Sequence, residues 1–212
     1  MLGRVQDQSQ LFIIDSLPVH RITTDKDALD QLAILKAKSI NNNPPVWEKA
    51  FNKSSKVFSL NICSLRNKIV DVREDLVLPF GDIIVLSESW LGQEVSEEDP
   101  SLQIGNYKLH LNSYGSGKGL AIYYKGDKFT PSQDYKTEYL QISILQSQDL
   151  CVVGLYRSDA NKTLAATLRE VTPEDGSCLV TGDFNICSAR YPDHEVFVTL
   201  RSMGFQLLQS RP

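Results

Sequence analysis

The sequence has no long hydrophobic run. None of its 212 residues lies in an apolar stretch that approaches the roughly 20 residues needed to span a membrane. No signal peptide is evident at its start. Hydrophobic residues make up 42% of the chain and charged residues 23%, which is typical of a globular domain. These absences predict an intracellular protein that does not have a membrane as its partner.

Cysteine and histidine are scarce and show no metal-binding spacing. The residues concerned are Cys63, Cys151, Cys178, Cys187, His20, His110 and His194. No two cysteines form a C-x-x-C pair, and the histidines lie far apart, so the pattern disfavours a zinc site. We interpret the cysteines as buried, reduced thiols.

Excess positive charge is also missing, since the net charge is −4. This is unfavourable for a protein that binds DNA, because phosphate contacts normally require a basic surface. A local basic patch near residue 60 could still supply such contacts. Its candidate members are Lys53, Lys56, Arg66 and Lys68.

Two short apolar runs end abruptly in polar side chains. Residues 83–86 lead into Glu88, and residues 179–180 lead into Asp183 and Asn185. Such runs are typical of buried strands that deliver a polar group at their carboxyl ends, where α/β sheets form ligand sites. Carboxylates and carboxamides together suit a hard cation such as Mg²⁺.

Hydrophobic periodicity predicts the remaining elements. Residues 57–62 and 150–156 read as strands, and 140–144 as a half-exposed strand. Helical spacing appears near 69–76, 164–171 and 196–203, the last closed by Gly204. Crossovers mixed with hairpins imply mixed sheets covered by helices, which makes the fold class α/β.

Five blocks, at 58–68, 86–91, 119–125, 154–157 and 181–185, resemble the endonuclease/exonuclease/phosphatase superfamily. They occur in the family's order. Within them, Asn61 and Glu88 match the metal-holding residues and Tyr156 matches the active-site tyrosine. The resemblance implies a two-sheet mixed α/β sandwich and an enzyme that cleaves phosphodiesters.

The resemblance also implies a mechanism. Mg²⁺, with Mn²⁺ as an alternative, would be held by Glu88 with Asn61 nearby. Asp183 would deprotonate the attacking water, and Asn185 and Tyr156 would hydrogen-bond the phosphate. No small-molecule cofactor is implied. Because residues 86–91 are similar to retrotransposon endonucleases, DNA is the expected substrate and partner.

The first 50 residues differ from the rest. Residues 1–14, with Arg4, resemble the last motif of Pif-type helicases, and the Asn-Asn-Asn-Pro-Pro run at 41–45 reads as a connection. We therefore expect a helicase-tail-like segment with linker over 1–50 and a nuclease domain over 55–212. This order resembles Helitron-like transposons and favours a nuclear location. An ordinary N-terminal extension is the alternative.

The sequence departs from the family at its end. Members normally carry a further aspartate and a final Ser-Asp-His on their last strands, whereas this sequence stops at Pro212. Pro192-Asp193-His194 resembles the triplet, but it opens a helical stripe. The expectation is a domain that is missing its last strands and is feebly active or inactive.

Other interpretations stay open. Glu88 could end a strand in solvent, Asn185 could cap a helix, and Tyr156 could belong to the core. The chain could also be a non-catalytic transposon remnant that only binds nucleic acid, or a phosphodiesterase acting on another phosphate ester.

Overall fold

The structure, a computed structural model, describes residues 2–4, 12–14, 55–75, 78–114, 117–158, 163–173, 176–187 and 190–207. For residues 2–4, 12–14 and 207, only the backbone is described. The connection predicted at residues 41–45 and Lys53 of the predicted basic patch lie outside the described residues.

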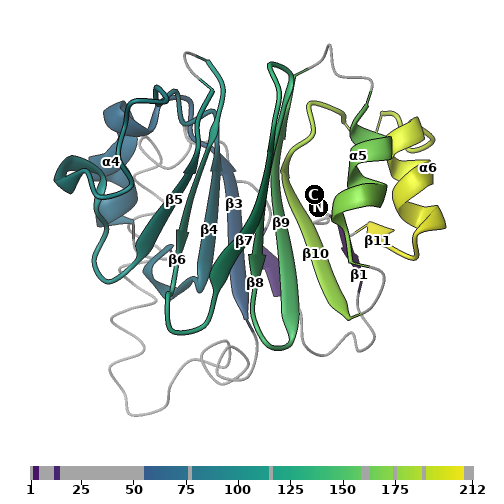
Figure 1. Ribbon diagram of the computed structural model, residues 1–212, viewed down its shortest axis with the longest axis horizontal. Coiled ribbons are helices and arrows are strands. Elements are labelled where there is room, and N and C mark those ends of the chain that lie inside the picture. The colour runs from purple at the N-terminus through teal and green to yellow at the C-terminus, as the bar shows by residue number, and fades with distance from the viewer. Residues whose placement is uncertain are drawn as a thin grey trace, which may run out of the picture.

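Two β-sheets pack face to face, with helices on their outer faces (Figure 1). The six-stranded sheet contains, in spatial order, β11 (Gln206–Leu207), β1 (Leu2–Arg4), β10 (Ser177–Asp183), β9 (Leu150–Arg157), β8 (Leu140–Gln146) and β7 (Thr130–Lys136). The five-stranded sheet contains β2 (Phe12–Ile14), β3 (Lys56–Asn61), β4 (Ile83–Ser87), β6 (Leu120–Tyr124) and β5 (Lys108–Asn112). Both sheets mix parallel and antiparallel pairs, so the predicted two-sheet mixed α/β sandwich is confirmed.

The helices lie outside the two sheets. Helix α4 (Leu65–Glu74) lies beside the five-stranded sheet, and α5 (Leu164–Val171) and α6 (Glu195–Ser202) lie beside the six-stranded sheet (Figure 1). The described residues also form two short 3-10 helices, η2 (Leu78–Phe80) and η3 (Pro100–Leu102). None of the helices in the described ranges is long and apolar enough to cross a membrane.

The N-terminal segment contributes a strand to each sheet. Strand β1 pairs antiparallel with β10, and β2 pairs parallel with β3. These two stretches of backbone are therefore part of the sandwich. The division of the chain at about residue 50 stays a prediction.

Most strands and helices form where the hydrophobic pattern predicts them, but the exposure predicted for residues 140–144 is wrong. Gln141 and Ser143 are fully buried. Ile142 faces the core beside α5 and α6, while Ser143 accepts a hydrogen bond of 3.2 Å from Asn112 of the opposite sheet. Alternating polarity usually indicates a strand with one solvent-exposed face, but here both faces of the strand are buried.

Glycine lets the two sheets approach closely at the centre of the sandwich. Val85 and Ile122 of one sheet pack against Val152 and Leu179 of the other. A Cβ atom at Gly154 of β9 would lie 2.9 Å from Ile122 Cδ1. The missing side chain therefore makes room for the opposing core, which is close-packed as protein interiors are.

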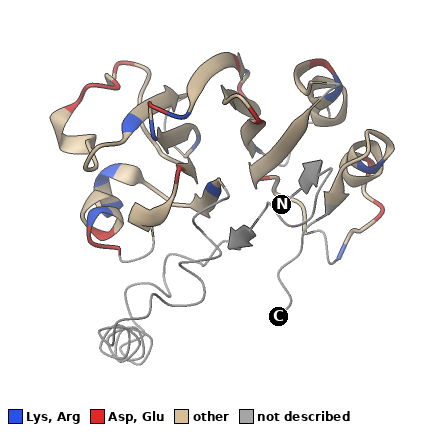
Figure 2. Ribbon diagram, turned by 90° about the horizontal axis from the view of Figure 1, so that it is seen from below, with Lys and Arg blue, Asp and Glu red and all other residues tan. Residues whose placement is uncertain are grey.

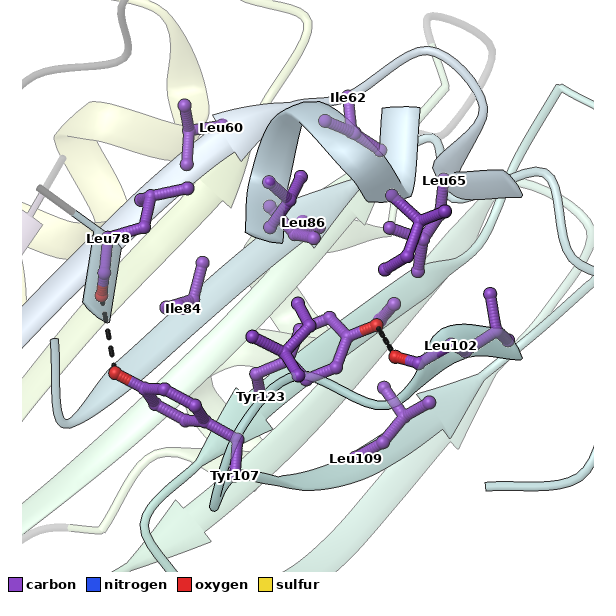
Figure 3. Packing of buried hydrophobic residues seen from close by; sticks show 14 of the residues in the cluster. Leu60, Ile62, Leu65, Leu78, Ile84, Leu86, Leu102, Tyr107, Leu109 and Tyr123 are labelled. Atoms are coloured by element: carbon purple, nitrogen blue, oxygen red, sulfur yellow. Dashed lines mark hydrogen bonds between the residues drawn. The ribbon is translucent and has the colours of Figure 1, made fainter. Parts of the chain in front are cut away.

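The outer core beneath α4 contains two buried tyrosines that hold connecting segments (Figure 3). The Tyr107 hydroxyl donates to Gly81 O at 2.6 Å and to Leu78 O at 3.2 Å. The Tyr123 hydroxyl donates to Leu102 O at 2.6 Å. Burial raises the pKa of Tyr107 to about 12, so the phenol stays a hydrogen-bond donor at neutral pH.

All four cysteines are free thiols, but they are not all buried. Cys151 and Cys178 lie in the core, whereas Cys63 and Cys187 are exposed. The prediction of buried thiols is thus wrong for these two residues. Each follows the end of a strand, where the chain leaves the sheet.

Acidic and basic residues are interspersed along the described elements (Figure 2). One cluster of opposite charges joins the segment after β4 to both sheets. His110 on β5 contacts Glu97 Oε1 through Nδ1 and Asp134 Oδ1 of β7 through Nε2, both at 2.9 Å. Burial opposes the imidazolium charge, but the hydrogen bonds and charges of both carboxylates outweigh it and raise the pKa of His110.

We predict that His110→Gln destabilises the fold more at about pH 6 than at about pH 9. The pKa of His110 in the unfolded chain is taken as that of an ordinary histidine. A histidine with a raised folded pKa adds stability that is complete below its unfolded pKa and is lost as pH rises through the folded value. Two charged hydrogen bonds are worth about 1.5–3 kcal/mol each at most. Urea unfolding at both pH values measures the difference, and an equal loss at both would contradict the prediction.

Gly182 is required where β10 pairs with β9. Its φ is +134°, and a Cβ atom there would lie 1.9 Å from Leu155 O. No side chain fits without separating the two strands. The residue that follows, Asp183, depends on this pairing for its position.

We predict that Gly182→Ala costs clearly more stability than the roughly 1–3 kcal/mol of an unfavourable backbone conformation alone. Gly105→Ala is the matched control, because Gly105 has a φ of +47° and nothing within 4 Å of the added Cβ. Urea midpoints of both variants give the comparison. Equal losses would show that the close contact at Leu155 is unimportant.

Candidate active site

Three of the predicted site residues reach the same end of the sandwich from inward-facing strand positions. Side chains alternate along a strand, so Asn61 shares the inner face of β3 with Val57, and Asp183 shares the inner face of β10 with Leu179. Tyr156 lies directly opposite Asp183 in the parallel pair of β9 and β10. The polar residues therefore lie where the apolar core between the sheets ends.

The Asn61 amide connects the two predicted carboxylates. Its Nδ2 donates to Glu88 Oε1 and to Asp183 Oδ2, each at 2.8 Å. The two carboxylate oxygens are therefore no farther apart than twice that distance. All three side chains are partly buried. The structure brings together residues 61, 88 and 183, which are far apart in sequence.

Glu88 stands on a loop that is held from both sides. Its carbonyl accepts from Ser64 N at 2.9 Å, and Ser89 N donates to Gly119 O at 3.2 Å. Glu88 itself has a φ of 54°, a left-handed conformation that is rare for residues with a side chain. Within the described ranges, the non-glycine residues with positive φ are Cys63, Ser64, Glu88, Trp90 and Asn185. They lie in the three loops that follow β3, β4 and β10, and such clustering of strain is typical of functional sites.

Asn185 is fixed by two hydrogen bonds. Its backbone N–H donates to Asp183 Oδ1 at 2.9 Å, and its side chain donates to the carbonyl of Arg157. It does not cap a helix, since α6 begins at residue 195 with His194 as its N-cap. A carboxamide carries two N–H donors, so one remains available beside Asp183.

The buried Arg157 supports this loop, and the sequence analysis assigned no role to it. Its Nη1 donates to Phe184 O at 3.1 Å, while its own carbonyl accepts from Asn185. Its position directly after Tyr156 was the available signal. Arg157 thereby fixes the turn between Asp183 and Asn185.

Tyr156 is almost fully buried, with its ring in the core between the sheets. Its hydroxyl donates to Gly117 O at 3.4 Å, which is long for a hydroxyl hydrogen bond. The core and active-site interpretations of this residue are thus compatible. The ring packs between the sheets while the hydroxyl lies at their end.

Cys63 is a contact of the cluster that the sequence analysis did not assign. Its Sγ lies 3.0 Å from Asn61 Oδ1 and 3.5 Å from Glu88 Oε2. Burial, followed by the nearby Glu88 and Asp183 charges, raises the pKa of Cys63. The thiol therefore stays protonated at neutral pH and can donate its one proton to either oxygen.

The cluster is chemically suited to a hard cation. Two carboxylates share one amide donor, and no ion pair to either carboxylate is found among the described residues. Oxygen donors from Glu, Asp and Asn side chains are those that Mg²⁺ and Mn²⁺ prefer. No group of three His, Cys, Asp or Glu side chains in the described ranges could hold a metal by itself, so a cation here would also need the amide, water or substrate oxygens.

Two of the four members of the predicted basic patch are paired with acids. Arg66 lies 3.2 Å from Asp99, and Lys68 lies 3.7 Å from Asp71. Of the two histidines in the described ranges, His110 bridges two carboxylates and His194 accepts from Val196 N at the start of α6. Residues 192–194, which resemble the family triplet, therefore precede α6, and His194 is its N-cap.

Comparison with known proteins agrees with this architecture. Two solved structures from Neisseria are similar: the 3' phosphatase NExo bound to a product DNA hairpin, and the 3'-5' exonuclease NExo from Neisseria meningitidis. They share 18% and 19% sequence identity with this chain, and each match has a TM-score of 0.54 and covers 70% of this chain and 71% of the other. At this identity the likeness establishes the fold. A search of curated proteins gives no significant match.

The family follows from the sequence match itself. A model described as the Endonuclease/Exonuclease/phosphatase family matches residues 58–195, a span that runs from β3 to the first turn of α6 and includes every predicted site residue. The chain belongs to the Endonuclease/Exonuclease/phosphatase family.

Proposed function

We propose that this chain is a metal-dependent phosphodiesterase acting on DNA, of the endonuclease type. The observation that carries the proposal is the Asn61 amide between the carboxylates of Glu88 and Asp183. Two carboxylates without a basic partner cost free energy unless a cation joins them. A cation at Glu88 and Asn61, Mg²⁺ or Mn²⁺, would polarise the phosphate and stabilise the leaving oxygen.

Other residues of the chain would have the remaining catalytic roles. Asp183 is the general base that orients and deprotonates the attacking water. The second N–H of Asn185 and the hydroxyl of Tyr156 donate to the phosphate oxygens as charge develops on them. Arg157 holds the loop that carries Asn185, so these donors are in place before substrate binds.

DNA is favoured over other phosphate esters because residues 86–91 are similar to retrotransposon endonucleases. The solved relative bound to a DNA hairpin is consistent with this choice. Origin from a Helitron-like transposon, a helicase-derived N-terminal segment and a nuclear location belong to the same proposal. A non-catalytic DNA-binding remnant is the competing proposal, and activity measurements decide between the two.

We predict that supercoiled plasmid is nicked when Mg²⁺ or Mn²⁺ is present and not when EDTA is present. Glu88→Gln and Asp183→Asn keep the shape of each side chain but remove its charge, so each lowers the nicking rate by at least about 10²-fold. Glu98→Gln is the matched control, because Glu98 is an exposed acid of the loop that follows. Nicking that survives both substitutions would contradict the assignment, and no nicking by the unaltered chain would favour the remnant.

We predict that Tyr156→Phe lowers kcat by roughly 10²–10³ with little change in KM, as expected for a donor used in the transition state. The ring stays in the core, so the urea midpoint changes little. Steady-state cleavage of a short labelled duplex gives both constants. An unchanged kcat would assign Tyr156 to packing alone.

A further inference from the structure

Two exposed aromatic residues lie at the site end of the sandwich. Trp90 is 44% exposed and Tyr139 is 41% exposed. Trp90 follows Glu88 by two residues, and Tyr139 lies in the turn that joins β7 and β8. In Figure 1, this turn lies at the same end as the carboxyl ends of β9 and β10. Large exposed rings cost free energy in water, so their position beside a site is informative.

Lys118 contacts both of these residues. Trp90 N donates to Lys118 O at 3.0 Å. The Lys118 ammonium lies 5.3 Å from the ring centre of Tyr114 and 5.5 Å from that of Tyr139, within the range of a cation–π contact. It is also 3.6 Å from Glu138. We call Trp90, Tyr114, Lys118 and Tyr139 the aromatic rim.

Hydrogen bonds tie the aromatic rim to the candidate active site. Gly117, next to Lys118, accepts from the Tyr156 hydroxyl at 3.4 Å. Tyr139 O accepts from Ser158 N at 2.9 Å, two residues beyond Tyr156. The rim therefore borders the phosphate position on the side of Glu88 and Tyr156.

We propose that the aromatic rim binds unpaired bases of the DNA next to the phosphate that is cleaved, by stacking them on Trp90 and Tyr139. This inference rests on the proposed function and narrows its substrate to DNA with a single-stranded or unstacked segment. Aromatic side chains next to a cation form stacking platforms for single strands. In a continuous duplex the flat faces of the bases are covered by their neighbours and cannot stack on protein rings.

A protein partner fits this surface less well. Protein interfaces use contiguous apolar patches of a few hundred Å² or more. Here the exposed Tyr139 ring lies beside the Lys118 ammonium, which is itself paired with Glu138. A cation between rings instead matches alternating phosphates and bases of a nucleic acid strand.

Binding measured in EDTA, where cleavage is not required, tests the proposal separately from catalysis. Fluorescence anisotropy is measured with a labelled single strand of about 20 nucleotides, which is long enough to fill the binding sites of known single-strand-binding proteins. The same sequence is also measured as a duplex. We expect tighter binding of the single strand. Trp90→Ala and Tyr139→Ala should each weaken it about 5- to 150-fold and should barely change binding of the duplex.

Phe80→Ala is the matched control. Phe80 is also exposed, at 46%, but it lies just before β4 begins, at the opposite end of that strand from Glu88. Its replacement should leave binding unchanged. Circular dichroism and urea midpoints verify that each variant is folded.

A second readout follows the ring directly. The sequence has two tryptophans, so Trp47→Phe leaves Trp90 as the sole one, and stacking of a base should quench its fluorescence. Equal affinity for duplex and single strand, unchanged binding by both rim variants, absence of quenching, or no DNA binding at all would each overturn the proposal. The proposed nuclease activity would still be tested separately, by metal-dependent plasmid nicking.

Discussion

Asn61 donates from one sheet to a carboxylate of the other, and the arrangement of the site depends on this contact. Asn61 ends β3 of the five-stranded sheet, Asp183 ends β10 of the six-stranded sheet, and Glu88 follows β4. The three groups meet only because the inner faces of the sheets pack closely below them, where Gly154 leaves room for Ile122. The geometry of the site therefore depends on the packing of the core.

The acidic character of the chain becomes understandable from the same contact. A net charge of −4 opposes binding of DNA, and basic and acidic residues are interspersed along the described elements (Figure 2). A divalent cation held by Glu88, with Asn61 nearby, would offset negative charge at the point where the phosphate approaches. Stacking on the aromatic rim would add binding free energy that does not depend on charge. Together they offer an acidic protein a physically reasonable way to bind a polyanion.

Much of this could be predicted from sequence because the signals are local. Apolar runs at 83–86 and 179–180 end in polar residues, and the strands form there with Glu88 and Asp183 at their carboxyl ends. The burial of Gln141 and Ser143 was missed because it depends on a facing sheet, which no local pattern reveals. The same holds for Cys63, Arg157 and the aromatic rim. Lys118 becomes a neighbour of Trp90 and of Tyr139 only through the pairing of distant strands.

The central claim is that Glu88, with Asn61 nearby, holds a cation beside Asp183. Crystals soaked in Mn²⁺ and measured at the manganese absorption edge test it most directly, because the anomalous signal locates the ion independently of activity. The account predicts one strong peak within bonding distance of a Glu88 carboxylate oxygen and near Asn61, which disappears in Glu88→Gln crystals. A peak only elsewhere on the chain, or none at a manganese concentration that supports nicking, would contradict it.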